Sequence, residues 1–191
     1  EEKEDFKKAI KEYVSYVENA DSTNVHPVLS RLVQVMFSME LNAEVVPYAE
    51  RLVSMDDNDL NTKVRLGLLY VDSDQFAKAI TVFNEVLSVV PESDKVLYYL
   101  AALYQETKQN GLALEYFSKI QDSSPLFQDS LLQRGEILSV EARAKFKLGK
   151  EISNELVAFI DTYSKKYDEV KVELGLIKAT YFDEISELEK S

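Results

Sequence analysis

The sequence predicts an all-α solenoid, in which pairs of antiparallel helices stack on one another. Two stretches, 64–94 and 98–125, repeat the same residue types at an offset of 34 positions. The residues Leu66, Tyr70, Ala79, Phe83 and Pro91 return as Leu100, Tyr104, Ala113, Phe117 and Pro125. Within each stretch the apolar residues fall three and four positions apart, which is the spacing of one helix face. Because a lone helix pair cannot bury both of its faces, this period is typical of stacked repeats.

The composition allows a folded core and restricts the partners. The chain has 191 residues, of which 46% are hydrophobic, and this excludes global disorder. Its net charge of −12 repels phosphate backbones and anionic lipid surfaces, so we expect no nucleic-acid binding and a neutral, basic or amphipathic partner. Since no apolar run approaches the roughly 18 residues of a transmembrane helix, we also expect no membrane span.

The unit at 60–93 is expected to fold as helix, turn, helix, turn. Asp74 is the expected N-cap of its second helix, and Pro91 stands where that helix should have stopped. Small residues at Gly67 and Ala79 would let the two helices approach closely.

The period and the pattern resemble the tetratricopeptide repeat. The family's signature places hold Leu66, Gly67, Tyr70, Phe76, Ala79, Phe83 and Pro91 in the unit from Leu60, and Leu100, Ala101, Tyr104, Ala113, Phe117, Ile120 and Pro125 in the unit from Asp94. Lys63 and Leu97 stand where the family usually has a tryptophan. The resemblance implies a right-handed superhelical array whose concave groove holds a peptide or protein segment.

The repeats are expected to extend over the whole chain as a single array. The expected segments are a half-repeat with only its second helix (1–23), repeats at 26–59, 60–93 and 94–127, an elongated repeat at 128–167 whose first helix ends near Gly149, and a terminal helix or cap at 168–191. The half-repeat is inferred because 5–17 matches the second helix at 74–87. Two explanations of the incomplete ends stay open, namely capping half-repeats and, the one we favour, a fragment of a longer array.

The sequence predicts no catalytic, cofactor or metal site. There is no cysteine and only one histidine, His26, which excludes an ordinary zinc site. The acidic stretch 55–63 lacks the glycine and the final glutamate of a calcium loop, and we interpret it as a turn that caps the next helix. Glycine-rich phosphate loops and a nucleophile elbow are also missing from the sequence. We therefore expect a protein that is not an enzyme.

The resemblance places candidate binding residues on the first helix of each pair, which lines the groove. The candidates are Asn61, Val64, Arg65, Leu68, Val71 and Asp72, then Lys95, Tyr98, Tyr99, Ala102, Gln105 and Glu106, then Asp129, Leu132, Gln133, Glu136, Ser139 and Val140. Tyr98 and Tyr99 would form an aromatic pair in the groove, unless one of them packs between helices. Val64, Leu68 and Leu132 either line the groove or belong to the core between repeats.

The expected function is a protein-interaction scaffold. The alternative is a structural spacer or a self-association segment of a larger protein, in which the terminal helices join copies. Members of the family that bind acidic chaperone tails carry a lysine and an asparagine where this chain has Val64 and Leu68, which disfavours that subclass. The compartment stays open, with the bacterial cell envelope favoured slightly over the cytoplasm.

Overall fold

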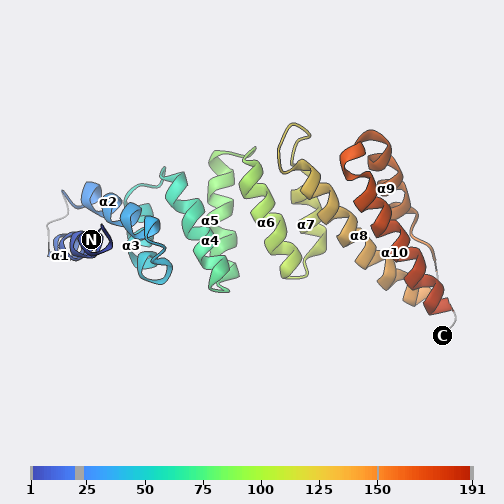
Figure 1. The fold of residues 1–191 in the computed structure, drawn as a ribbon, viewed down its shortest axis with the longest axis horizontal. Coiled ribbons are helices and arrows are strands. Elements are labelled where there is room, and N and C mark those ends of the chain that lie inside the picture. Colours follow the sequence, from blue (N-terminus) through green and yellow to red (C-terminus); the bar gives the residue numbers. More distant parts are fainter. Residues whose placement is uncertain (1, 20–23, 150, 190–191) are drawn as a thin grey trace. The chain divides into compact units, whose positions relative to one another are not determined.

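The computed structural model describes residues 2–19, 24–149 and 151–189, and throughout these ranges the regular elements are helices (Figure 1). The α-helices are α1 (Glu2–Asn19), α2 (Val25–Ser38), α3 (Asn42–Met55), α4 (Leu60–Asp72), α5 (Phe76–Val89), α6 (Asp94–Glu106), α7 (Asn110–Ser118), α8 (Phe127–Gly149), α9 (Asn154–Lys166) and α10 (Lys171–Glu189). A short 3-10 helix, η2 (Asp168–Val170), precedes α10. Parts of the predicted half-repeat (1, 20–23) and of the terminal helix (190–191) lie outside the described residues. The all-α prediction is confirmed.

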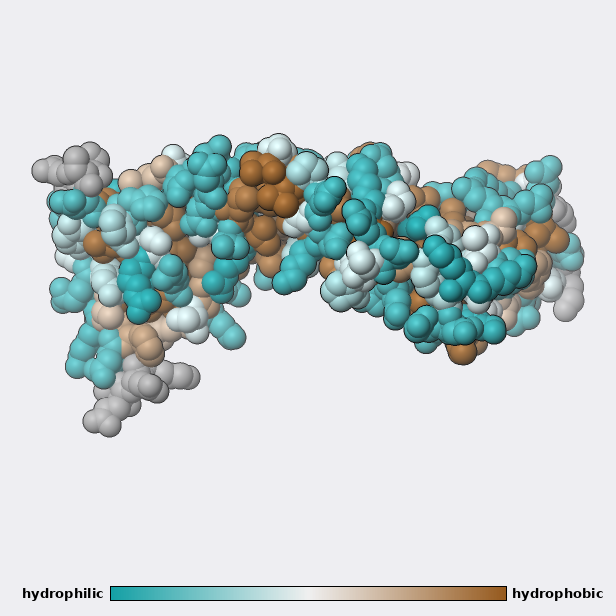
Figure 2. Space-filling view, turned by 90° about the horizontal axis from the view of Figure 1, so that it is seen from above, coloured by the Kyte–Doolittle hydropathy of each residue, from teal (hydrophilic) through white to brown (hydrophobic). Residues whose placement is uncertain are grey.

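The helices form two compact units, residues 1–89 and 90–191. In the first unit each helix packs against the next, from α1 to α5. In the second unit α6 packs on α7 and α7 on α8, while α8, α9 and α10 lie against one another. On the face drawn in Figure 2, hydrophilic side chains predominate and apolar side chains gather in separate patches. The division of the chain into individual repeats stays a prediction.

The turn inside three helix pairs recurs with the period seen in the sequence. Glu40, Asp74 and Lys108 adopt positive φ angles of 56°, 56° and 60°. In each turn the next backbone N–H donates to a carbonyl five residues earlier, Leu41 to Met36 at 3.0 Å, Gln75 to Tyr70 at 2.8 Å and Gln109 to Tyr104 at 2.7 Å. This pattern is a Schellman ending of the first helix.

The turn corrects one expectation about helix capping. Asp74 is the left-handed residue that ends α4, whereas α5 begins at Phe76, so the prediction of Asp74 as an N-cap is wrong. Aspartate serves in either place because its short polar side chain tolerates the left-handed region. At Asp59 the capping prediction is confirmed, since Oδ1 accepts the Thr62 N–H at 3.0 Å.

Gly67 lets α4 and α5 approach closely. A Cβ atom added to Gly67 would lie 2.5 Å from Cε1 of Phe83, whose ring is fully buried. Gly175 follows a leucine in α10 just as Gly67 does in α4, yet a Cβ added there would meet no described atom within 4 Å. The same Leu-Gly pair therefore marks a covered helix face in α4 and an open one in α10.

Lys63 occupies the place of the family's tryptophan and is buried, with 4% of the residue exposed. Its ammonium group forms ion pairs with Asp57, before α4, and with Glu85 of α5 at 2.9 Å. Burial opposes the charge, but the hydrogen bonds to Asp57 and Glu85 outweigh burial and raise the pKa of Lys63. The lysine thus fills the place of the aromatic ring with its stem and ties α4 to α5 with its charge.

Tyr70 connects α4 to the preceding helix pair. Its hydroxyl donates to Oε1 of Glu50 on α3, and the Lys78 ammonium lies 3.4 Å from the same oxygen and 4.9 Å from the Tyr70 ring centroid. Burial, followed by the hydrogen bond to Glu50 and its negative charge, raises the pKa of Tyr70 far above its usual value. Tyr70 is therefore a polar link between helix pairs as well as a core residue.

In the second unit, α10 completes the core. Tyr181 is fully buried in a cluster that includes Phe146 of α8 and Leu156 of α9. The Tyr181 hydroxyl accepts the Ser153 N–H at 2.9 Å, and Ser153 in turn caps α9. Because Phe146 belongs to this core, α8 must continue through residue 146, and the long helix predicted to end near Gly149 is observed.

The two glycines of the Leu-Gly pairs should respond oppositely to alanine. We expect Gly67→Ala to lower the free energy of unfolding by about 1–3 kcal/mol, because the new methyl group collides with the Phe83 ring. Gly175→Ala should raise it by up to about 1 kcal/mol, because alanine is the better helix former and meets no neighbour. Urea unfolding followed by circular dichroism measures both changes. If both variants change the free energy of unfolding equally and in the same direction, the difference between a covered face at Gly67 and an open face at Gly175 is contradicted.

Tyr70 should make stability fall at high pH. At about pH 8 we expect Tyr70→Phe to be less stable than wild type by about 1–2 kcal/mol, because a buried hydrogen bond is lost. Above about pH 10 the unfolded chain releases the Tyr70 proton while the folded chain keeps it, so stability declines with rising pH. The difference between wild type and variant should then shrink by up to about 1.4 kcal/mol per pH unit.

The measurement is urea unfolding of both proteins at a series of pH values from 8 to 11. Tyr16→Phe, at an exposed tyrosine of α1, controls for the loss of one phenol. If the free energies of unfolding of wild type and Tyr70→Phe change with pH in parallel, the ionisation of the Tyr70 hydroxyl is not coupled to folding.

Candidate functional site

The candidate residues of the first unit lie along α4. Asn61, Arg65 and Asp72 are exposed, and Val64 and Leu68 are half-buried. The Arg65 guanidinium lies 4.0 Å from the centroid of the Phe37 ring on α2. Arg65 is thus held against the neighbouring first helix by a cation–π contact. Val64 and Leu68 are only partly covered, so the structure keeps both interpretations of these two residues open.

On α6, Lys95 and Glu106 are exposed, whereas Tyr98, Tyr99, Ala102 and Gln105 are half-buried. The Tyr98 ring meets Phe117 of α7 edge-on, with 5.3 Å between centroids and 74° between planes. Burial and then the charge of Asp129 on α8 raise the pKa of Tyr98. Tyr98 therefore contributes its ring to the packing of α6 on α7, which is the alternative that the sequence offered for one member of the tyrosine pair.

On α8, Asp129, Glu136 and Val140 are exposed, Leu132 and Gln133 are half-buried, and Ser139 is buried. Leu132, Gln133, Glu136 and Ser139 line a hollow of about 400 Å³ between α8 and α10. The other lining residues are Arg143 of α8 and Glu173, Leu176, Ile177 and Thr180 of α10. Four of the predicted residues of α8 therefore line the same hollow, and Asp129 lies outside it.

A second hollow of about 550 Å³ follows the same two helices toward their C-terminal ends. It is lined by Val140, Arg143, Ala144 and Lys147 of α8 and by Glu184, Glu187 and Leu188 of α10. Arg143 lines both hollows and therefore lies between them. Together the two hollows form a path between α8 and α10, which we call the α8–α10 groove.

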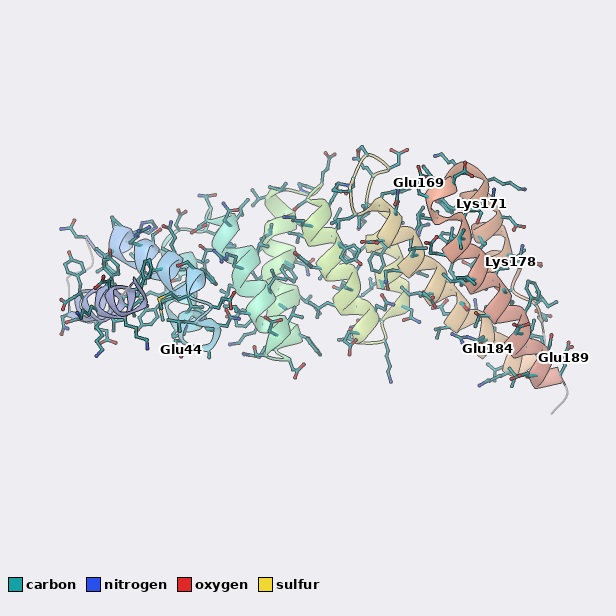
Figure 3. The ribbon with its side chains drawn as sticks, viewed as in Figure 1. Glu44, Glu169, Lys171, Lys178, Glu184 and Glu189 are labelled. Atoms are coloured by element: carbon teal, nitrogen blue, oxygen red, sulfur yellow. The ribbon has the colours of Figure 1, made fainter. Side chains whose placement is uncertain are left out.

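An ion pair joins the two walls of the groove. Nη1 of Arg143 donates to both carboxylate oxygens of Glu184, at 2.8 and 2.6 Å, and Nε donates to the Ser139 carbonyl at 3.3 Å. On α10, which carries Lys178 and Glu184 (Figure 3), Lys178 turns to α9 and donates to Asp161 at 2.6 Å. This hydrogen bond lowers the pKa of Asp161. Polar bonds thus hold α10 to both α8 and α9.

The α10 wall of the groove was not among the residues predicted from the sequence. Its groove residues Glu173 and Leu176 lie within the stretch 172–178, "VELGLIK", which echoes "VRLGLLY" at 64–70, and Thr180 lies just after it. Applying the family's groove positions to this helix as well would have selected these three residues. The signal was present, but the helix was interpreted as a terminal cap rather than as a groove wall.

Across residues 5–19, 24–149 and 151–189, no three or more His, Asp or Glu side chains are grouped so that they could hold a metal ion. Within the same ranges, no helix combines the length and the apolar character needed to cross a membrane.

Comparisons with known proteins support the repeat and the fold. The tetratricopeptide repeat family matches residues 60–92. The chain is similar to a crystal structure of MamA, with a TM-score of 0.60 and 16% identity over 99% of this chain and 94% of that one. It is also similar to MamA 41-end from Desulfovibrio magneticus RS-1, with a TM-score of 0.57 and 16% identity over 97% and 86% of the two chains.

A third similar structure is YrrB, described as a TPR protein with an unusual peptide-binding site. Its TM-score is 0.58 and its identity 16%, over 92% of this chain and 82% of YrrB. No curated protein sequence matches the chain. The identities are low, so these structures support the fold alone, whereas the match at 60–92 is in the sequence itself. The chain therefore carries a match to the tetratricopeptide repeat at 60–92 and is similar in fold to tetratricopeptide-repeat proteins.

Proposed function

We propose that this protein is a non-enzymatic scaffold that binds an amphipathic protein segment with basic residues in the α8–α10 groove. The tetratricopeptide fold suggests a protein–protein interaction scaffold. The observation that carries the finer proposal is the pair of hollows along α8 and α10, which combine apolar side chains with carboxylates. Such a groove suits a helix or an extended segment that has one apolar and one charged face.

The apolar part of the groove supplies the binding free energy. Leu176 is 62% exposed, and it lines the first hollow beside Leu132 and Ile177. Covering a leucine of this kind with an apolar partner side chain removes its surface from water, which contributes about 25 cal/mol per Å². A partner that places leucine-like residues at helical spacing would cover these residues together.

The charged part of the groove selects the partner. Glu136 and Glu173 are exposed on the two helices that form the first hollow, and the whole chain carries a net charge of −12. Acidic segments and nucleic acids are therefore repelled, and lysine or arginine residues are attracted. The exposed candidates on α4 and α6 are proposed as further contacts for longer partners.

Self-association is a second candidate function, and a different observation favours it. The α10 face around Gly175 is open, and Val172 beside it is 68% exposed. In α4 the corresponding Gly67 is covered by a helix, so the open face offers a place for a helix from another copy. Size-exclusion chromatography with light scattering over a range of concentrations tests this candidate, and a monomer at every concentration would exclude it.

The groove is tested with a fluorescein-labelled helical peptide of leucines and lysines, the leucines at positions i, i+3, i+4 and i+7. We expect Leu176→Ser to weaken its binding roughly tenfold, or about 1.4 kcal/mol, because an exposed apolar anchor is lost. Fluorescence anisotropy gives the dissociation constants.

The matched control is Leu112→Ser on α7, where the leucine is 38% exposed and lies outside the groove. This variant should bind the peptide as the wild type does. If both serine variants lose the same affinity, or if the wild type does not bind the peptide, the groove is not the binding site.

A further inference from the structure

We propose that the first hollow of the groove contains a subsite for one lysine or arginine side chain of the bound segment, formed by Glu136, Glu173 and Ser139. This inference rests on the proposed function and names the part of the partner that the groove recognises. It requires three properties of the hollow: negative charge on both walls, a polar group without a partner in its lining, and an apolar surface for the aliphatic stem.

The negative charge comes from two helices. Glu136 of α8 and Glu173 of α10 line the same hollow, and neither forms an ion pair with another residue among those the structure describes. A cation placed between the walls would therefore interact with both carboxylates. Such charge-assisted hydrogen bonds are about twice as strong as bonds between neutral groups.

The unused polar group is Ser139. The residue is 3% exposed, lines the hollow, and its hydroxyl makes no hydrogen bond with any described residue. Serines in helices commonly bond back to the preceding turn, as Ser130 of the same helix does to the Phe127 carbonyl at 2.7 Å. A hydroxyl oxygen that lines the hollow can accept a hydrogen bond from the N–H groups of a bound cation.

The protein's own basic side chains leave this subsite to a partner. Arg143, the cation that lines the hollow, is held by both oxygens of Glu184. Arg134 of α8 lies over the rings of Phe159 and Tyr163 on α9, at 4.9 and 5.4 Å from their centroids. Because these guanidinium groups are engaged elsewhere, Glu136 and Glu173 keep their negative charge available.

The apolar surface completes the match to a long basic side chain. Leu132, Leu176 and Ile177 line the same hollow as the two carboxylates. Lysine and arginine place their methylene groups on apolar surface while their charged ends bind polar groups. A metal ion would bind the carboxylates but would make no use of the apolar side chains. The presence of both in one hollow therefore favours a lysine or arginine side chain as the ligand.

The test compares the leucine–lysine peptide with a copy in which every lysine is acetylated, so that the stems remain and the charge is lost. We expect Glu136→Gln/Glu173→Gln in the full chain to weaken binding of the lysine peptide at least tenfold and to leave binding of the acetylated peptide unchanged. Ser139→Ala should weaken binding of the lysine peptide two- to fivefold. An arginine peptide, run in parallel, decides which of the two side chains binds more tightly.

The matched control is Glu169→Gln/Glu189→Gln, which removes the same charge from η2, directly before α10, and from the last residue of α10 (Figure 3), outside both hollows. Equal losses in the two double variants would mean general attraction to an acidic surface and would overturn the subsite. If the acetylated peptide binds the wild type as tightly as the lysine peptide does, the proposed subsite is wrong but the proposed groove is retained. If neither peptide binds, both the groove and the subsite are wrong.

Discussion

The packing of α10 on α8 is the contact on which the second unit and its groove depend. Leu174, Ile177 and Tyr181 of α10 are buried in one cluster with Leu131 and Phe146 of α8. Without this apolar contact the groove would have only one wall. Arg143 and Glu184 then link the same two helices across the groove. Burial of apolar surface drives the two helices together, but the hydrophobic effect has no preferred direction. The two-oxygen ion pair adds a contact with a defined geometry.

The repeat shows how one sequence pattern acquires different roles in different surroundings. The Leu-Gly pair of α4 receives the Phe83 ring, whereas that of α10 has no described atom over its glycine. At the place of the family's tryptophan, Lys63 is buried and paired with two carboxylates, whereas Leu97 is a buried core residue. The Schellman turn recurs after α2, α4 and α6, because it is a constraint on the backbone. The side chains around it are free to differ.

The groove follows from a departure within the array. The helix α8 is long and α10 packs along it, so that the two form a path with carboxylates on both sides. Elsewhere the predicted groove residues have other contacts, since Tyr98 packs on Phe117 and Arg65 lies over Phe37. The proposed binding surface is therefore defined by the space between α8 and α10, and only in part by each residue's place in the repeat.

By itself the sequence determined the helices, their 34-residue period and the length of α8, because helical periodicity and the repeat offset are local properties of the chain. It also placed Gln133, Glu136 and Ser139 on the correct helix. Only the tertiary structure decided that Asp74 ends α4 rather than capping α5, because the two roles share one residue type and differ in the φ angle. The α10 wall, the Arg143–Glu184 bridge and the unpartnered Ser139 likewise depend on contacts between residues up to 41 positions apart, which no local pattern specifies.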